Sequence, residues 1–244
     1  MLEKDKLSNY FEDYIKKEPL FLDKKVLQSN YIPETIHHRE EQIKKVASML
    51  APALRIEKPS NMFIYGKTGS GKTLTIQHVT DNMIQIAEKN NLPVKIHYLN
   101  CKLKRVSDTE YRLIAELARF LDTEIPATGL PTDEVYKMFI SALEKKKILM
   151  ILILDEIDQL VSKAGDQILY TLTRLNSELK NSQISLIGIS NDLMFTNYLD
   201  PRVKSSLSEE ELVFPPYNAI QLQAILRERS ERAFRKGCIE DGVL

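Results

Sequence analysis

Eight consecutive residues, 66–73, read Gly-Lys-Thr-Gly-Ser-Gly-Lys-Thr and match the phosphate-binding pattern G-x-x-x-x-G-K-[ST] at every fixed position. The pattern follows a short apolar run, Met62–Tyr65, and precedes a segment with helical periodicity, as this loop requires. Glycines let backbone N–H groups turn toward one centre, and the helix N-terminus adds partial positive charge there. We therefore expect ATP or ADP at this loop, with Lys72 on the β- and γ-phosphates and the Thr73 hydroxyl on Mg²⁺. The nucleotide-binding residues expected in the loop are Gly66, Thr68, Gly69, Ser70, Gly71, Lys72 and Thr73.

Two acids, Asp155 and Glu156, follow the uninterrupted apolar run Ile148–Leu154. Seven apolar residues are too few for a globular helix and are typical of a strand that is buried on both faces. Acids at the end of such a strand resemble the Walker B motif. Because ligands gather at the carboxyl ends of parallel strands, we expect Asp155 to hold Mg²⁺ and Glu156 to polarise the attacking water.

Two further polar residues lie near the ends of later elements. Asn191 follows the apolar run Ile184–Ile189, so its amide could orient the water, although an Asn closing a strand is equally an ordinary turn former. Arg202 lies in the sequence Asp-Pro-Arg, and an arginine there could stabilise the γ-phosphate charge of a neighbouring subunit. A surface arginine beside a turn fits the same spacing.

Predicted strands alternate with predicted helices along most of the chain, which favours an α/β domain with a mostly parallel sheet. Residues 1–30 are polar with scattered aromatics and indicate an arm. Ser107 and Glu110 form a capping-box pattern that opens one helix. The expected helices cover residues 34–54, a segment from Thr73, a segment from the capping box, a segment around Val135–Leu143, residues 168–179 and a segment from about Ala219.

Composition excludes several classes of protein. The 244 residues include 34 basic and 34 acidic ones, so the net charge of zero gives no global electrostatic case for nucleic acid, although a local basic surface is still possible. The two cysteines, Cys101 and Cys238, form no zinc-binding pattern. No stretch approaches the ~20 apolar residues needed to cross a bilayer. We expect no membrane association and a cytoplasmic, nucleoid-associated protein.

Several motifs in order are more specific than the phosphate loop: Tyr31-Ile32-Pro33, His38-Arg39-Glu40, and then IGISND, LDPRVKSSL and FPPYNAIQLQAILRER. Together they resemble archaeal replication initiators of the origin-recognition type, which are AAA+ ATPases, from about Tyr31 to Phe234. The resemblance implies a P-loop NTPase fold with a five-stranded parallel sheet flanked by helices. It also implies an arm over 1–30, a nucleotide-binding domain over 31–214, and over 215–244 the start of a helical lid, truncated before a winged-helix domain.

The resemblance implies roles for particular residues. Tyr31 and Ile32 would wall the adenine pocket, and Tyr217 and Arg229 would contact the nucleotide from the lid. Asn191 would be the sensor 1 residue, and Arg202 is the expected arginine finger, although eukaryotic relatives often carry Ser-Arg where this chain has Ser205-Ser206. A DNA-contacting insertion would lie within about 101–130. Its candidate residues are Lys102, Lys104 and Arg105, in a segment whose charges nearly balance and which equally fits a solvated helix face.

The implied function is an ATP-dependent initiator that binds double-stranded origin DNA and acts as an ATP/ADP switch in recruiting a replicative helicase of the MCM type. Its ATPase activity would be weak and would serve the switch, and a paralogous initiator or a second copy would be a further partner. One alternative is a clamp-loader-like or remodelling AAA+ ATPase, and another is a nucleotide-switch signalling ATPase without a DNA role. Turnover rate and DNA dependence separate these three.

Overall fold

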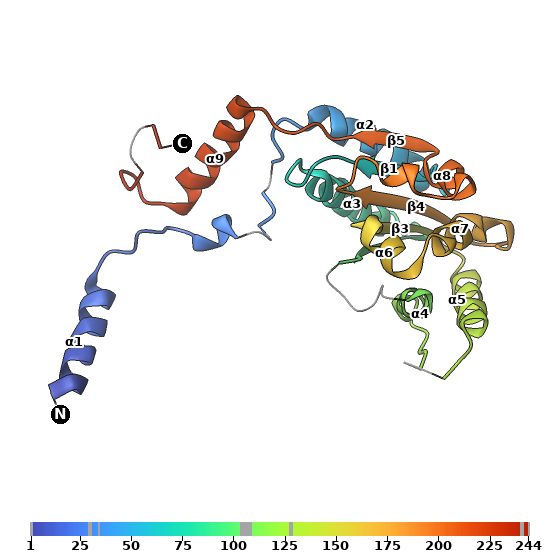
Figure 1. Ribbon diagram of the computed structural model, residues 1–244, viewed down its shortest axis with the longest axis horizontal. Helices are drawn as coiled ribbons and strands as arrows, with labels where there is room; N and C mark the ends of the chain where they lie inside the picture. Colours follow the sequence, from blue (N-terminus) through green and yellow to red (C-terminus); the bar gives the residue numbers. More distant parts are fainter. Residues whose placement is uncertain are drawn as a thin grey trace. The chain divides into compact units, whose positions relative to one another are not determined.

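The computed structural model describes residues 2–28, 31–33, 35–102, 109–126, 129–239 and 242–243, with side chains from residue 7 onward. It divides the chain into two compact units (Figure 1). The larger one, here called the α/β unit, is Arg39–Pro216, and the second unit combines Met1–His38 with Tyr217–Leu244. The α/β unit begins at Arg39, eight residues after the start expected for the nucleotide-binding domain.

Five parallel strands form the sheet of the α/β unit, in the order β2-β3-β4-β1-β5. This arrangement confirms the predicted fold class. The strands are β1 (Met62–Tyr65), β2 (Val94–Asn100), β3 (Leu149–Asp155), β4 (Gln183–Ser190) and β5 (Glu210–Val213). Since all strands run in one direction, their carboxyl ends lie along one edge of the sheet, and β1, β4 and β3 are consecutive neighbours there.

Helices cover both faces of this sheet (Figure 1). They are α2 (Glu40–Leu50), α3 (Lys72–Lys89), α4 (Glu110–Phe120), α5 (Thr132–Lys146), α6 (Ile157–Ala164), α7 (Gln167–Arg174) and α8 (Pro201–Leu207). The helix expected over 34–54 begins at Glu40 and gives way to a 3-10 turn, Ala51–Arg55, which contains Pro52. The cap of α4 is also corrected: Thr109 is the N-cap, because its Oγ1 accepts the N–H of Arg112, and Ser107 lies outside the described residues.

Strand β3 is the central apolar strand, and it is buried on both of its faces. Its alternate side chains enter two separate cores. Met150, Leu152 and Leu154 pack with α4–α8, whereas Leu149, Ile151 and Ile153 pack with α2 and α3. Both faces of the central strand are therefore removed from water. This burial fixes the carboxyl end of the strand, which is Asp155, and Glu156 follows it directly.

The second unit contains α1 (Leu2–Lys16), a 3-10 turn (Lys24–Leu27) and α9 (Ala219–Ala233). A single bridge joins Phe21 to Phe234, whose rings lie 4.9 Å apart. Helix α9 starts with a capping box between Asn218 and Gln221. Within the described part of the chain, no helix is both long and apolar enough to span a membrane.

Candidate nucleotide-binding site

The phosphate loop joins the end of β1 to the start of α3, and two of its glycines are required by its path. Gly71 immediately precedes the helix with φ of 85°, in the left-handed region that favours glycine. Gly66 lies so close to the chain after β5 that a Cβ there would be 2.4 Å from the carbonyl oxygen of Phe214. The loop's path therefore depends on contacts with the end of the α/β unit, as well as on the helix that follows.

Lys72 is only 4% exposed and lies beneath the loop. Its Nζ donates to the carbonyl oxygens of Gly66 at 2.7 Å and Lys67 at 3.0 Å, and to Asn191 Oδ1 at 2.8 Å. Burial lowers the pKa of Lys72 from its ordinary value, while the negative charges of Asp155, Asp158 and Glu156 act in the opposite direction. The loop lysine and the residue that follows β4 are thus in direct contact.

Thr73 and Asp155 form the second contact of the site. Thr73 Oγ1 donates to Asp155 Oδ2 at 2.6 Å, and Tyr98 Oη donates to the same oxygen at 2.7 Å. The other carboxylate oxygen accepts the backbone N–H of Glu156 at 2.8 Å. A hydroxyl and a carboxylate are hard oxygen ligands of the kind that Mg²⁺ takes, so this pair fits the expected metal.

Tyr98 was not identified from the sequence, because a lone tyrosine carries no motif. Strand β2 pairs with β3 so that Tyr98 lies opposite Ile153, two residues before Asp155. Burial, and then the hydrogen bond to Asp155, raise the pKa of the Tyr98 hydroxyl well above its ordinary value, so it remains a donor at neutral pH. The register of the sheet, which a single sequence does not reveal, supplies this contact.

Glu156 has φ of 53° and ψ of 47°, a left-handed conformation that is costly for a residue with a Cβ. It is the N-cap residue of α6, so the chain turns sharply between β3 and that helix. Its Oε2 lies 3.6 Å from Lys102 Nζ, just beyond the end of β2. The expected catalytic acid therefore occupies a conformationally constrained position directly beside Asp155.

Asp158, one turn further on, accepts a hydrogen bond at 2.8 Å from the Ser190 hydroxyl at the end of β4. Tyr65 and Ser190 are register partners, as are Asp155 and Ile189. The ends of β1, β3 and β4 therefore lie side by side, and the Ser190–Asp158 hydrogen bond links the end of β4 to α6. Asp158 thus has a hydrogen-bond partner at the end of β4.

Arg202 is not among the residues gathered around Lys72. It lies on α8, where its Nε and one terminal nitrogen donate to the two oxygens of Asp200, each at 3.0 Å. Its guanidinium also lies 5.2 Å from the centre of the Tyr170 ring. The hydrogen bond from Arg202 lowers the pKa of Asp200. Arg202 is thus a surface residue with its own acidic partner.

The other residues expected to contact nucleotide belong to the second unit. Arg229 lies over the Tyr31 ring at 5.7 Å, and Arg232 donates to the Tyr31 hydroxyl at 3.1 Å. Ile32 is exposed, and Tyr217 is partly buried just before α9. Tyr31 and Arg229, which lie almost two hundred residues apart in sequence, are therefore brought together.

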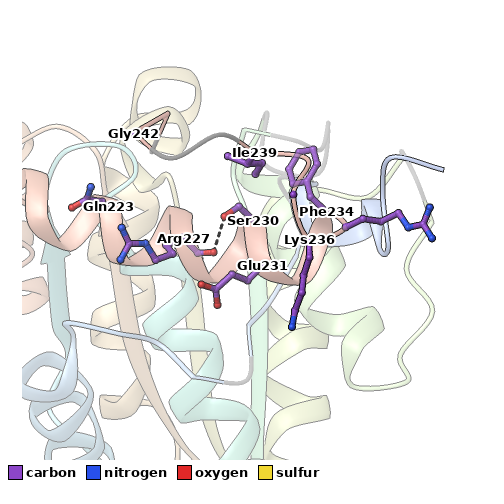
Figure 2. Close-up of a pocket in the computed structure, with 10 residues that line it drawn as sticks. Gln223, Arg227, Ser230, Glu231, Phe234, Lys236, Ile239 and Gly242 are labelled. Atoms are coloured by element: carbon purple, nitrogen blue, oxygen red, sulfur yellow. Dashed lines mark hydrogen bonds between the residues drawn. The ribbon is translucent and has the colours of Figure 1, made fainter. Parts of the chain in front are cut away.

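The DNA-contact candidates are only partly described. Lys102 is exposed and faces Glu156, as described above, while Lys104 and Arg105 lie outside the described residues. The second unit also contains a cavity of about 500 Å³ alongside α9 and the chain after it, and none of the expected site residues lines it (Figure 2). Its lining includes Gln223, Arg227, Ser230, Glu231, Phe234 and Lys236.

Comparison with known proteins gives a consistent result. Residues 55–193 match the family described as "AAA domain". An ORC1-type DNA replication protein of Pyrococcus furiosus is 49% identical over 243 residues, which cover 98% of this chain and 57% of that protein. The chain thus spans little more than half the length of this curated relative.

Solved structures agree. The Aeropyrum pernix ORC1 protein in complex with DNA matches with a TM-score of 0.82 and 42% identity, over 91% of this chain and 56% of that one. The Aeropyrum pernix ORC2 protein in its ADPNP-ADP complexes matches with a TM-score of 0.74 and 26% identity, over 89% and 58%. The chain therefore belongs to the AAA-domain family and, within it, to the archaeal replication initiators of the ORC1/Cdc6 type.

Proposed function

We propose that this chain is the nucleotide-binding part of an ATP-dependent DNA replication initiator and that it works as a slow ATP/ADP switch. The observation that carries the proposal is the pair of contacts at the carboxyl edge of the sheet, from Lys72 to Asn191 and from Thr73 to Asp155. These contacts join the phosphate loop to the ends of two neighbouring strands. Membership of the initiator family supports the DNA-replication context.

Each part of the site has a distinct task in nucleotide binding. The loop offers backbone N–H groups and the start of α3 to the phosphates, and Lys72 adds a positive charge beneath them. Thr73 and Asp155 would hold Mg²⁺, which when bound neutralises charge on the β- and γ-phosphates. Tyr98 keeps the Asp155 carboxylate oriented.

Hydrolysis needs a base and an orienting group for the attacking water. Glu156, at its constrained turn, would accept the proton of the water. With the Asn191 oxygen held by Lys72, its amide NH₂ is the end that donates to the water or to a γ-phosphate oxygen. Asn191 would thereby report whether the third phosphate is present.

Slow turnover follows from the position of the proposed arginine finger. Arg202 points to Asp200 within its own chain, so it would have to reach the γ-phosphate of a neighbouring initiator, either a paralogue or a second copy. We further propose that Tyr31, Ile32, Tyr217 and Arg229 contact the nucleotide. This would make the position of the lid depend on ATP, the differential contact that a switch requires. The family resemblance supports this step.

We also propose that Lys102, Lys104 and Arg105 contribute to binding of double-stranded origin DNA and that the switch acts in recruitment of a replicative helicase of the MCM type. A near-neutral chain must rely on a few placed cations for such contacts, because global charge adds nothing.

The test combines turnover with DNA binding. The purified chain is assayed for retained ADP, for ATP hydrolysis over many turnovers, and for duplex binding by fluorescence anisotropy with ATP or ADP present. We expect hydrolysis well below the roughly 1 per second at the low end of ordinary enzymes, retained nucleotide, and duplex binding that differs between ATP and ADP. Rapid multiple turnover would instead identify a remodelling motor. Nucleotide-dependent switching without any duplex binding would identify a signalling ATPase.

A further inference from the structure

A buried arginine that the nucleotide chemistry does not use connects two parts of the α/β unit that are remote in sequence. Arg39, just before α2, is only 2% exposed. Its Nε donates to the carbonyl oxygen of Ser70 in the phosphate loop at 2.8 Å. One of its terminal nitrogens donates to the carbonyl oxygen of Pro215 at 2.6 Å. Its guanidinium also lies 5.8 Å from the centre of the Phe214 ring.

The bond to Ser70 acts on a peptide that matters for phosphate binding. A planar trans peptide points its C=O and its N–H in opposite directions, so holding the Ser70 oxygen also fixes the direction of the Gly71 N–H. That N–H is one of the loop donors next to the start of α3, where an anion would bind. Arg39 therefore contacts the Ser70–Gly71 peptide on the side opposite to the Gly71 N–H.

The bond to Pro215 acts on the end of the α/β unit, which finishes at Pro216. Phe214 is buried and its N–H donates to the Tyr65 carbonyl oxygen at 2.8 Å. Its own carbonyl oxygen fills the space where Gly66 lacks a side chain. The first residue of the loop and the last residues of the unit therefore pack directly against each other, and Arg39 adds a second link between them.

We propose that Arg39 is a positioning residue that couples the phosphate loop to the end of the α/β unit, so that binding of a nucleoside triphosphate at the loop is transmitted to residues 214–217. This rests on the proposed nucleotide binding. The coupling is reciprocal, so a ligand that holds residues 214–217 in one arrangement changes ATP affinity by the same factor. A guanidinium suits this role because its rigid fork presents donors in two directions, whereas a lysine ammonium on a flexible stem does not reproduce that geometry.

The test compares Arg39→Lys, which keeps the charge but removes the fork, with Arg55→Lys, the same change at an exposed arginine of the same unit. Mg·ATP affinity is measured by calorimetry, folding by thermal unfolding, and amide hydrogen exchange at Phe214 and Tyr217 with and without ATP. We expect Arg39→Lys to weaken ATP binding by about tenfold or more, the scale of one lost charge-assisted hydrogen bond. ATP should protect the two amides in the wild-type chain and in Arg55→Lys but not in Arg39→Lys.

A purely structural role predicts a different pattern: Arg39→Lys would lower the unfolding temperature and leave the ATP-dependent protection intact, which would overturn the proposal. If the variant does not fold, the wild-type chain decides, since bound ATP without any exchange change at Phe214 and Tyr217 also overturns it. The variant Lys72→Ala separates failure of this proposal from failure of the proposed nucleotide site. If the nucleotide site is wrong, Lys72→Ala binds ATP as tightly as the wild-type chain does.

Discussion

The two units of the chain hold their functional side chains in different ways. In the α/β unit, the side chains around the phosphate loop are buried or partly buried and are bonded to one another, as with Lys72 to Asn191 and Thr73 to Asp155. In the second unit, contacts are made on the surface, as with Arg229 over Tyr31 and His37 beside Glu228 at 2.7 Å. The first arrangement is rigid, and the second costs little to rearrange.

This difference matches the tasks that we propose for the two units. Phosphate and metal chemistry requires fixed geometry, because charge stabilisation depends on donors and ligands that are already in place. A nucleotide-dependent lid requires the opposite, since two arrangements that differ by a few kcal/mol are what a ligand can switch. Exposed ion pairs contribute roughly 0–1 kcal/mol each, which leaves such an equilibrium easy to shift.

The largest effect is expected for hydrolysis when the α/β unit loses its base. Glu156→Gln should bind Mg·ATP as the wild-type chain does, yet hydrolyse it about 100-fold more slowly or worse, because general-base assistance is worth ~10²–10⁴-fold. Single-turnover assays with ATP in excess of its dissociation constant measure this. The control is Glu178→Gln, an exposed acid of the same unit. Hydrolysis by Glu156→Gln at the wild-type rate would remove Glu156 from the mechanism.

Stability should separate the two units when the same residue type is truncated in each. Phe139 is fully buried in α5, whereas Phe11 is 54% exposed in α1. Phe139→Ala should lower the free energy of unfolding by about 3–5 kcal/mol, because it leaves a cavity, and Phe11→Ala should change it by less than about 0.5 kcal/mol. Urea denaturation followed by circular dichroism gives both values. Equal costs would mean that α1 is packed in solution and that the contrast between the units is wrong.

A smaller effect is expected from the contact that the sequence did not reveal. Tyr98→Phe removes the hydroxyl that donates to Asp155 Oδ2 and should weaken Mg·ATP binding by about tenfold, the scale of one hydrogen bond to a charged carboxylate. Affinity for ATP in the absence of Mg²⁺ should not change. Tyr111→Phe is the matched control, since that hydroxyl bonds to the Pro126 carbonyl oxygen. A Tyr98→Phe effect that is equal with and without Mg²⁺ would show that Asp155 is not the ligand being oriented.

The smallest effect is expected at Arg202, whose pair with Asp200 is exposed. Arg202→Ala should raise the pKa of Asp200 toward its ordinary value of 3.8, and NMR titration of the carboxyl group measures this change. Because the pKa of Asp200 is lower in the folded chain than in the unfolded chain, the pair with Arg202 stabilises the fold at pH values above the ordinary pKa. This stabilisation is lost as the pH falls through the lowered pKa. ATP affinity of the isolated chain should stay unchanged; a marked loss would place Arg202 at its own chain's nucleotide.

The sequence predicted most helices and strands of the α/β unit, and the structure brings Lys72 to Asn191 and Thr73 to Asp155. Runs such as Ile148–Leu154 are unambiguous because burial on both faces requires an unbroken apolar strand. Strand β5 was not predicted from pattern, since it has four residues and only Leu212 is buried. Residues 1–30 were predicted to be a polar arm, and in α1 the apolar residues from Leu7 onward are exposed and form no core. Tyr98 and Arg39 depend on strand register and on contacts across up to 176 residues of sequence, which no local pattern contains.

The most direct test of the account is calorimetric titration of Mg·ATP into the wild-type chain and into Lys72→Ala. The account predicts saturable binding to the wild-type chain and no measurable binding to the variant, because the only buried cation that contacts both the loop and Asn191 among the described residues is removed. The variant must first be shown to unfold at a temperature close to that of the wild-type chain. ATP affinity of folded Lys72→Ala equal to that of the wild-type chain would contradict the assignment of residues 66–73 as the phosphate site.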